Sequence, residues 1–192
     1  QPDVTVEPAG ADFSGELQDV GQILTVPESL ATTISGSPGV DRAIPRVLVP
    51  NVVVLDQDGR PLGLDRGGFG GGTAIAQSWV AEPRLNATES VTGDAPTEAG
   101  EMASDAGSAR QLAAAPGDDV TVMLPTGERE QFRLSGLTQL QNAAGLGVTF
   151  VYWDFGTAQR LLLDPGQATS IAVLADPGVA QATVRDRIEP LL

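Results

Sequence analysis

The tripeptide Asp154-Phe155-Gly156 matches a catalytic motif, since protein kinases use the aspartate of this motif to hold a magnesium ion. Kinase chemistry also needs a lysine that contacts the nucleotide phosphates and a His-Arg-Asp catalytic loop. The chain contains no lysine and no histidine, so the kinase interpretation fails. We predict instead that Asp154 is the N-cap of a helix, because its carboxylate can accept hydrogen bonds from the free N–H groups of the first turn.

A glycine-rich segment, residues 66–72, reads Arg-Gly-Gly-Phe-Gly-Gly-Gly. A phosphate-binding glycine loop is followed by Lys-Ser/Thr, or has the dinucleotide-binding spacing between a strand and a helix, and neither is found here. We interpret the segment as a flexible hairpin tip or a loop between subdomains. Contact with a partner is the alternative, with Phe69 as an apolar tip. The candidate contact residues are Gly67, Gly68, Phe69 and Gly70.

Acidic side chains suggest two further kinds of site. Asp56, Asp58 and Asp65 lack the twelve-residue spacing and the closing glutamate of a calcium-binding loop, so we predict a hairpin turn there. Asp118-Asp119 follows Pro116-Gly117 and also indicates a turn. Two carboxylates can perform acid–base catalysis, but no spacing in the sequence pairs two of them across a cleft.

Two other local features favour a structural interpretation. Asn86-Ala87-Thr88 fits a glycosylation sequon, which we interpret as accidental. The large aromatic residues Trp79, Tyr152 and Trp153 lie in expected strands, where such residues belong to the core more often than to a ligand platform.

The composition excludes several classes of protein. The 25 acidic residues outnumber 11 basic ones, all arginine, and the formal charge of −14 disfavours nucleic acid and an anionic membrane surface as partners. Without histidine or cysteine the chain cannot form a Ser-His-Asp triad, a thiolate nucleophile or a histidine-ligated metal site. Hydrophobic residues make up 41% of the chain, which is enough for a core. We therefore expect a globular domain that is not an enzyme and has no cofactor or metal.

The ends of the chain suggest a piece of a longer protein. No run approaches the roughly 20 apolar residues that span a bilayer. Gln1 begins a polar segment without an initiating methionine or the basic region of a signal peptide. We expect further sequence on both sides.

Hydrophobic periodicity predicts strands and helices in an α+β order. Expected strands are residues 4–6, 47–49, 52–55, 74–80, 120–124, 131–134, 150–153 and 170–175. Expected helices are a first one that begins at Pro27 and ends by Gly36, with Thr25 as N-cap, and others at 103–115, 157–163 and 179–192. Tight turns are expected at 56–60 and 125–128. Periodicity assigns no element to residues 86–102.

The segment from Leu85 to Leu140 resembles a known pattern: a strand and turn, a short strand, a helix with small residues, a Gly-Asp turn and a hairpin that ends in glycine. These features fall at 91–96, 101–105, 108–112, 116–120 and 132–137. Residues 3–8, the helix at Pro27, and the segments 151–161 and 170–192 resemble the opening and closing parts of the same pattern. On these residues the chain resembles the extracytoplasmic domains of MacB/FtsX/LolC-type ABC-transporter permeases. The 67–72 loop departs from the pattern, and 104–107 looks like a small insertion.

The resemblance implies an α+β fold with two parts. A discontinuous porter-like βαβ subdomain, residues 1–79 plus 166–192, would carry an inserted β-rich Sabre-like subdomain, residues 80–165. The domain would lie at the extracytoplasmic face of the plasma membrane, between the first two membrane helices of a permease. Its implied partners are a cytoplasmic ATP-binding subunit acting through the membrane part, an unidentified extracytoplasmic substrate or protein, and a second permease copy. The domain would be non-catalytic and would transmit ATP-driven motion (mechanotransmission).

Two alternatives stay open at this point. A free secreted binding or adhesion module would have a signal peptide upstream and a stop codon soon after Leu192. A hydrolase that uses carboxylates would lose its activity on Asp-to-Asn substitution. No residue selects the transported or contacted molecule.

Overall fold

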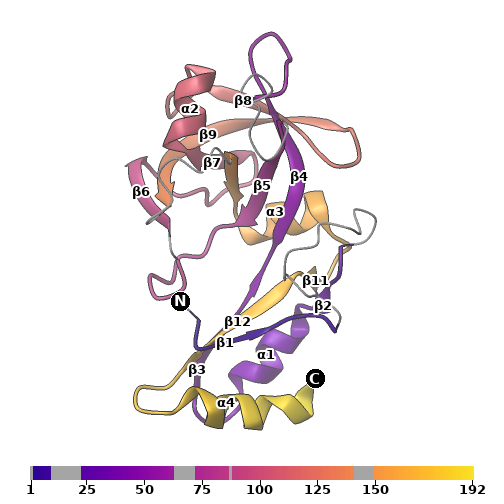
Figure 1. Cartoon of the computed structure of the whole chain (residues 1–192), viewed down its shortest axis with the longest axis vertical. Coiled ribbons are helices and arrows are strands. Elements are labelled where there is room, and N and C mark those ends of the chain that lie inside the picture. Colours follow the sequence, from indigo (N-terminus) through magenta and orange to yellow (C-terminus); the bar gives the residue numbers. More distant parts are fainter. Residues whose placement is uncertain (1, 10–22, 63–71, 87, 141–148) are drawn as a thin grey trace.

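The computed structural model describes residues 2–9, 23–62, 72–86, 88–140 and 149–192. They form two main sheets, one after the other along the long axis of an elongated domain (Figure 1). No helix in the described ranges is long and apolar enough to cross a membrane.

The smaller sheet has three antiparallel strands in the order β1-β12-β3. They are β1 (Val4–Val6), β12 (Ser170–Ala175) and β3 (Val40–Arg46). The central strand β12 is buried on both faces, which explains why its sequence is one apolar run without alternation. Its side chains divide by parity: Ile171 and Val173 belong to one apolar cluster, and Ala172 and Leu174 to another.

Two helices cover the Ile171 face of the smaller sheet. They are α1 (Ser29–Ser35) and α4 (Gln181–Ile188), the latter followed by the 3₁₀ turn η2 (Glu189–Leu191). Ile34 of α1 and Val184 and Ile188 of α4 are buried in the same cluster as Ile171. A two-stranded ribbon, β2 (Val26–Pro27) with β11 (Gln167–Ala168), adds to this core.

The larger sheet has seven strands in the order β6-β9-β7-β10-β5-β4-β8, and β8 also pairs with β9. Its strands are β4 (Leu48–Leu55), β5 (Ala74–Ser78), β6 (Thr88–Gly93), β7 (Glu101–Asp105), β8 (Asp119–Met123), β9 (Arg129–Leu140) and β10 (Thr149–Trp153). The second pairing of β9 closes six of them into a ring, with β6 attached outside it. Closure removes the exposed edges that an open sheet presents to other chains.

A bulge in β4 supports this closure. Pro50 is exposed, Asn51 adopts φ 69°, and the register shifts between Val49 and Val52. The strand pairs with β5 on both sides of the bulge, at Leu48–Val49 and at Val52, and pairs with β8 only after it, at residues 53–55. Bulges increase local twist and are the usual way a strand turns a corner, so Pro50 marks a bend inside one strand and does not divide two.

The interior of the ring is filled by one large apolar cluster. Trp153 and Phe132 are its largest members, with ring centroids 5.1 Å apart. Helices α2 (Ala106–Leu112) and α3 (Phe155–Leu162) contribute further apolar side chains, among them Leu112 and Leu161. Both helices begin at an aspartate: Asp105 accepts from Ser108 N–H, and Asp154 accepts from Thr157 N–H at 3.0 Å. The prediction that Asp154 is an N-cap is confirmed.

The predicted start and N-cap of the first helix were wrong. Thr25 does not cap the first helix; its hydroxyl donates to Gln167 Oε1, and the helix starts after Glu28. Residues Val26–Pro27, expected to begin this helix, form strand β2 instead. The segment 103–115 contains a helix, as predicted, at residues 106–112, and residues 101–105 pair with β9 and β10 as the short strand that the resemblance implied.

The division of the chain into subdomains remains a prediction, and strand pairing suggests different boundaries. Strands β4 and β5, which the predicted 1–79 segment includes, pair within the larger sheet. Helix α3 also packs into the larger core. We propose that the smaller unit comprises, among the described residues, 2–9, 23–46 and 166–192, and that the chain enters the larger unit at Val47.

Candidate functional site

The junction between the two sheets is the candidate functional site. The chain crosses from the smaller to the larger sheet at Val47 and returns after α3. Residues 79–86 leave the larger sheet, pack on the smaller one and then lead into β6. Any force between the two sheets must pass through these connections and the contacts that surround them.

Two buried hydroxyl side chains hold the crossing at Val47. Val47 N–H donates to Ser78 Oγ at 3.0 Å, and Ser78 N–H donates to Val47 O at 2.9 Å. Thr169 Oγ1 accepts from Leu48 N–H at 2.9 Å and donates to Arg46 O at 3.0 Å. A strand that changes sheets loses regular ladder partners, and buried backbone groups without partners are costly. Ser78 and Thr169 supply those partners and so link the β3–β4 crossing to β5 and to the start of β12.

The segment 79–86 forms a small apolar contact with the smaller sheet. Val80 and Leu85 are buried against Ala172 and Leu174, with Ile44 partly buried beside them. This is the face of β12 opposite the helices. The two faces of one central strand therefore carry the helical layer and the connection to the larger sheet.

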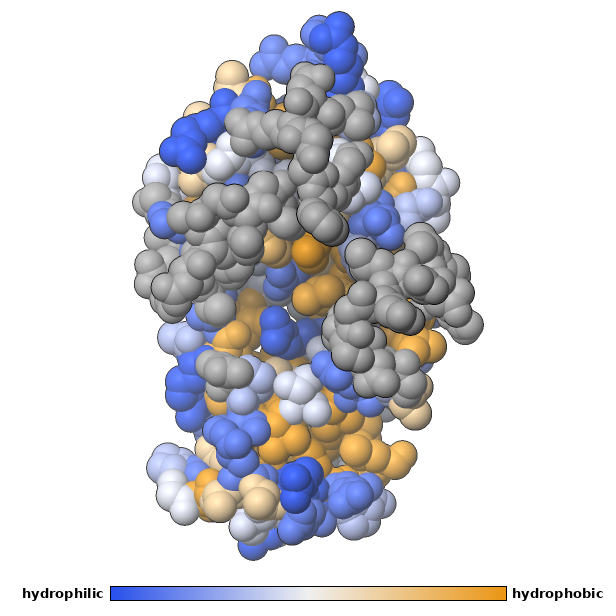
Figure 2. Space-filling model, in the orientation of Figure 1, coloured by the Kyte–Doolittle hydropathy of each residue, from blue (hydrophilic) through white to orange (hydrophobic). Residues whose placement is uncertain are grey.

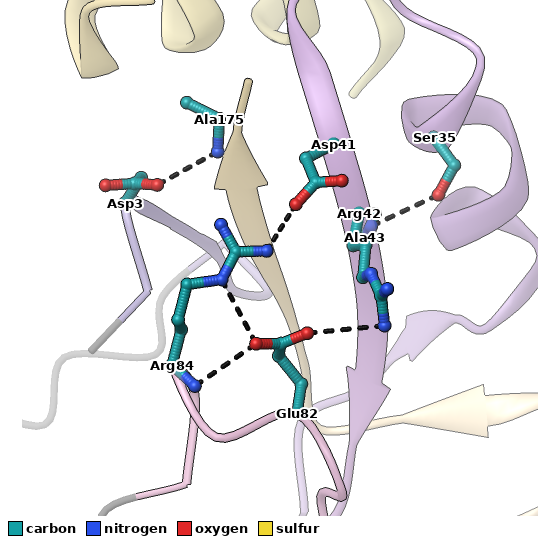
Figure 3. Close-up of polar contacts among 8 residues, drawn as sticks. All are labelled: Asp3, Ser35, Asp41, Arg42, Ala43, Glu82, Arg84 and Ala175. Carbon is teal, nitrogen blue, oxygen red and sulfur yellow. Dashed lines mark hydrogen bonds and ion pairs between the residues drawn. The ribbon is translucent and has the colours of Figure 1, made fainter. Parts of the chain in front are cut away.

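A chain of ion pairs reinforces this contact, as Figure 3 shows. Arg84 pairs with Asp41 of β3 and, through Nε at 3.1 Å, with Glu82. Glu82 also pairs with Arg42 at 3.3 Å. Hydrogen bonds from the Arg84 side chain and backbone lower the pKa of Glu82, and hydrogen bonds to Asp41 and Glu82 raise the pKa of Arg84. Exposed pairs add little stability, so their main effect here is to fix the position of the segment on β3.

Asp3 connects the first described strand to the C-terminal part of the chain. One carboxylate oxygen accepts from Ala175 N–H at 2.9 Å, and the other accepts from the Gln181 side chain at 3.1 Å. The hydrogen bond from the Ala175 backbone is the main cause that lowers the pKa of Asp3. Strand β1, the end of β12 and helix α4 are therefore joined at one carboxylate.

Phe155 joins the two apolar cores directly. Its ring is partly buried and packs against both the cluster inside the ring and the cluster beneath the helices. Four residues further along α3, Gln159 donates to Gln167 O at 2.8 Å and to the Glu28 side chain. Helix α3 is thus attached to both units.

Some of the sequence-derived candidates lie in the junction or beside it, and others lie outside the described residues. Gly67, Gly68, Phe69, Gly70 and Asp65 lie outside the described residues. Asn86 forms a turn, accepting from Thr88 N–H and donating to Val80 O. Trp153 is fully buried, as predicted, whereas Trp79 is half-buried and packs edge-on against buried Tyr152.

Three aspartates line a shallow hollow of about 460 Å³: Asp56, Asp118 and Asp119. Asp56 Oδ1 accepts from the N–H groups of Asp58 and Arg60, which confirms the predicted turn. Asp118 Oδ2 accepts from Ala115 N–H at 2.8 Å. Across the described ranges no three acidic side chains form a group that could hold a metal ion. Two of the three carboxylates are thus engaged in turns.

Sequence reasoning missed the residues of the junction. Arg84 and Asp41 are 43 positions apart, and Thr169 and Leu48 are 121 apart. No local pattern joins residues at such separations. The one available signal was Glu82-Pro83-Arg84, a charged pair in a short connection between strands, where loop charges often carry function.

The fold is that of the extracytoplasmic domains of bacterial ABC-type transporters. The periplasmic region of MacB from Actinobacillus actinomycetemcomitans superposes with a TM-score of 0.62 at 13% identity, over 97% of this chain and 80% of that one. The extracellular domain of the noncanonical ABC-type transporter YknZ from Gram-positive bacteria superposes with a TM-score of 0.64 at 9% identity, over 98% of this chain and 92% of that one. Among curated protein sequences, none matches.

The chain belongs to the MacB-like periplasmic core domain family, whose sequence model matches residues 2–191. The resemblance seen in the sequence and the α+β fold class are therefore confirmed. The family consists of domains on the extracytoplasmic side of membrane transporters.

We expect Asp3 to contribute to the acid sensitivity of the domain. A carboxylate with a lowered pKa stabilises the fold above its unfolded value of about 3.9, and this contribution is lost as the pH falls through the folded pKa. Asp3→Asn removes one of its two acceptor oxygens, so it should cost about 1 kcal/mol at pH 7 and less near pH 3. Urea unfolding at both pH values measures this difference. Asp164→Asn, an exposed turn position, is the control; an equal loss at both pH values for Asp3→Asn would contradict the assignment.

Proposed function

We propose that this domain transmits motion, without catalysis, as the extracytoplasmic part of an ABC-transporter permease. In such a protein both ends of the domain continue into membrane helices, and a separate cytoplasmic ATP-binding subunit moves those helices. The output would be substrate handling or activation of a partner outside the membrane.

The arrangement of the chain ends carries this proposal. Strand β1, the first described element, and helix α4, which only the 3₁₀ turn η2 follows, both belong to the smaller unit (Figure 1) and are joined through Asp3. A displacement of either end would therefore reach β12, the central strand of that unit. Rigid-body motion of a packed unit is an established way to carry a signal.

The junction supplies the path from the smaller unit to the larger one. Ser78, Thr169, Phe155 and the Arg84 ion pairs join the two units at separate points. Contacts at several points resist both rotation and separation, whereas a single covalent crossing would act as a hinge. We infer that the two units move together.

The test uses the full-length permease with its ATP-binding subunit. In the double variant Ser78→Ala/Thr169→Val we expect ATP hydrolysis within about twofold of the native rate and a several-fold lower output per ATP, because the crossing at Val47 no longer holds the two units rigidly. Asp58→Asn, in an exposed turn, is the control. Unchanged output per ATP in a folded double variant would contradict the proposal.

The native gene offers an independent test. Apolar runs of about 18 or more residues, one before Gln1 and at least three after Leu192, are expected for a permease. A cleavable signal peptide upstream and a stop codon downstream would instead indicate a secreted binding module.

A further inference from the structure

A cavity of about 260 Å³ lies at the junction, between the two units. The smaller unit contributes Arg46 of β3, and the larger unit contributes Gln77 of β5 and Tyr152 of β10. Trp79 and Asn86, from the connecting segment, complete this part of the wall. The cavity is thus built by residues far apart in the sequence and from both sheets.

Arg46 is unusual among the arginines that the structure describes, because all the others are exposed. It forms no ion pair with any described carboxylate, although acidic residues outnumber basic ones 25 to 11. Burial lowers the pKa of its guanidinium. A charge that is partly removed from water and has no partner is unfavourable. The expected remedy is an anion in the cavity that Arg46 lines.

The Arg46 guanidinium offers donors only, and the Gln77 side-chain amide offers an NH₂ donor as well as a carbonyl acceptor. Asn86 already bonds Val80 and Thr88, and the Tyr152 hydroxyl lies 3.3 Å from Thr88 Oγ1. The Gln77 side-chain amide makes no hydrogen bond with the described residues, so its NH₂ group is available in the cavity wall that Arg46 also lines. The Arg46 guanidinium carries five N–H donors in one plane, an arrangement that suits a carboxylate best.

The apolar part of the wall includes two aromatic rings beside Pro2, Val80 and Leu85. The rings of Trp79 and Tyr152 lie 5.8 Å apart at 84°, edge to face. Tyr152 is buried and supports the Trp79 ring, and the half-buried Trp79 ring is the surface on which a flat apolar group can stack. The volume of about 260 Å³ is below the range of about 300–1,000 Å³ for drug-sized ligands. A ligand must therefore be small.

We propose that this junction cavity binds a small organic anion, with its carboxylate on Arg46 and Gln77 and a flat apolar body against Trp79. The site has contributions from both units, so occupancy would add a further connection between them. Binding does not depend on the transmission role proposed above, and either idea can fail alone.

Benzoate is a suitable probe, with benzamide as the uncharged molecule of the same shape. Titration of the isolated 192-residue domain is followed by calorimetry and by tryptophan fluorescence, since Trp79 lines the cavity and Trp153 lies inside the core. We expect saturable benzoate binding and at least about tenfold weaker benzamide binding, because only the carboxylate forms charge-assisted hydrogen bonds. Equal affinity for both probes, or no saturation by benzoate up to about 50 mM, would overturn the proposal.

Arg46→Met retains much of the apolar stem and removes the charge. We expect it to reduce benzoate affinity at least about tenfold and to leave benzamide binding unchanged. Arg133→Met, an exposed position on β9, is the matched control and should bind as the native chain does. If Arg46→Met does not fold, Arg46→Lys and a salt titration of the native chain replace it. Benzoate affinity that neither substitution nor salt lowers would also overturn the proposal.

Discussion

Trp153→Ala should destabilise the domain by about 3–5 kcal/mol, the loss typical of truncating a large buried aromatic side chain. Trp153 is fully buried inside the ring of strands and packs against Phe132. No described residue accepts a hydrogen bond from its indole N–H, so its contribution comes from packing alone. Because domains are stable by only about 5–15 kcal/mol, this loss is a large share of the total.

Trp153→Phe is the matched control for this prediction. It keeps an aromatic ring in the core and removes an indole N–H that has no partner among the described residues, so it should cost much less than alanine. Trp79→Ala, at a half-buried position, should also cost less. Urea unfolding followed by circular dichroism gives all three values. A loss below about 1 kcal/mol for Trp153→Ala would show that the ring is not packed around this side chain.

Ser78→Ala should cost about 1–3 kcal/mol, because it leaves the buried Val47 N–H without its acceptor. Thr169→Val removes the acceptor for Leu48 N–H and keeps the shape of the side chain. Both substitutions act at one crossing, so their effects on the free energy of unfolding should couple. The loss in the double variant should therefore differ from the sum of the losses in the two single variants. A double-mutant cycle on the isolated domain measures this coupling.

Ser108→Ala controls for the loss of a buried hydroxyl elsewhere. Ser108 is buried and its hydroxyl donates to Thr149 within the larger unit, away from the Val47 crossing. It should lower stability without coupling to Ser78→Ala. Strict additivity of Ser78→Ala and Thr169→Val would contradict a shared role at the crossing.

The sequence predicted the elements whose signals are local. Strand β12 is an unbroken apolar run between a serine and an Asp-Pro-Gly turn, and its predicted bounds agree with the structure. The β8–β9 hairpin follows from Pro-Thr-Gly-Glu between two β-rich runs. The N-cap at Asp154 could be predicted because the short side chain of an aspartate that follows a strand can accept hydrogen bonds from the free N–H groups at the start of the next helix.

The sequence could not predict features that depend on distant partners. The parallel pairing of β7 with β9, which helps to close the ring, joins segments that have no local connection. Pro27 fits the rule for a first helical position, yet it lies opposite Gln167 in a ribbon. Val47 is one of several consecutive apolar residues, and only the pairing of its neighbours shows that the chain changes sheets there.

The surface does not by itself indicate a partner. Figure 2 shows hydrophobic side chains on the half of this face that holds β1 and α1, with hydrophilic ones around them. The large hydrophobic residues described as exposed are Ile23, Leu24, Leu191 and Leu192. They lie outside the packed cores, so the proposed transmission rests on the junction and on the position of the chain ends.

Double electron–electron resonance on the full-length permease tests the proposed transmission most directly. The chain has no cysteine, so spin labels at Asp186→Cys on α4 and Thr126→Cys in the β8–β9 turn report on the two units, once any cysteines elsewhere in the protein are replaced. A third label on a membrane helix reports the position of the domain relative to the membrane part of the permease.

We expect a narrow distribution of distances between the labels at positions 186 and 126, with the same mean in nucleotide-free and ATP-trapped protein. The distance from position 126 to the membrane label should change between these two states. In the Ser78→Ala/Thr169→Val double variant the distribution of 186–126 distances should broaden. A shift of the 186–126 distance with nucleotide would contradict motion as one body. No change in either distance would contradict transmission of motion by this domain.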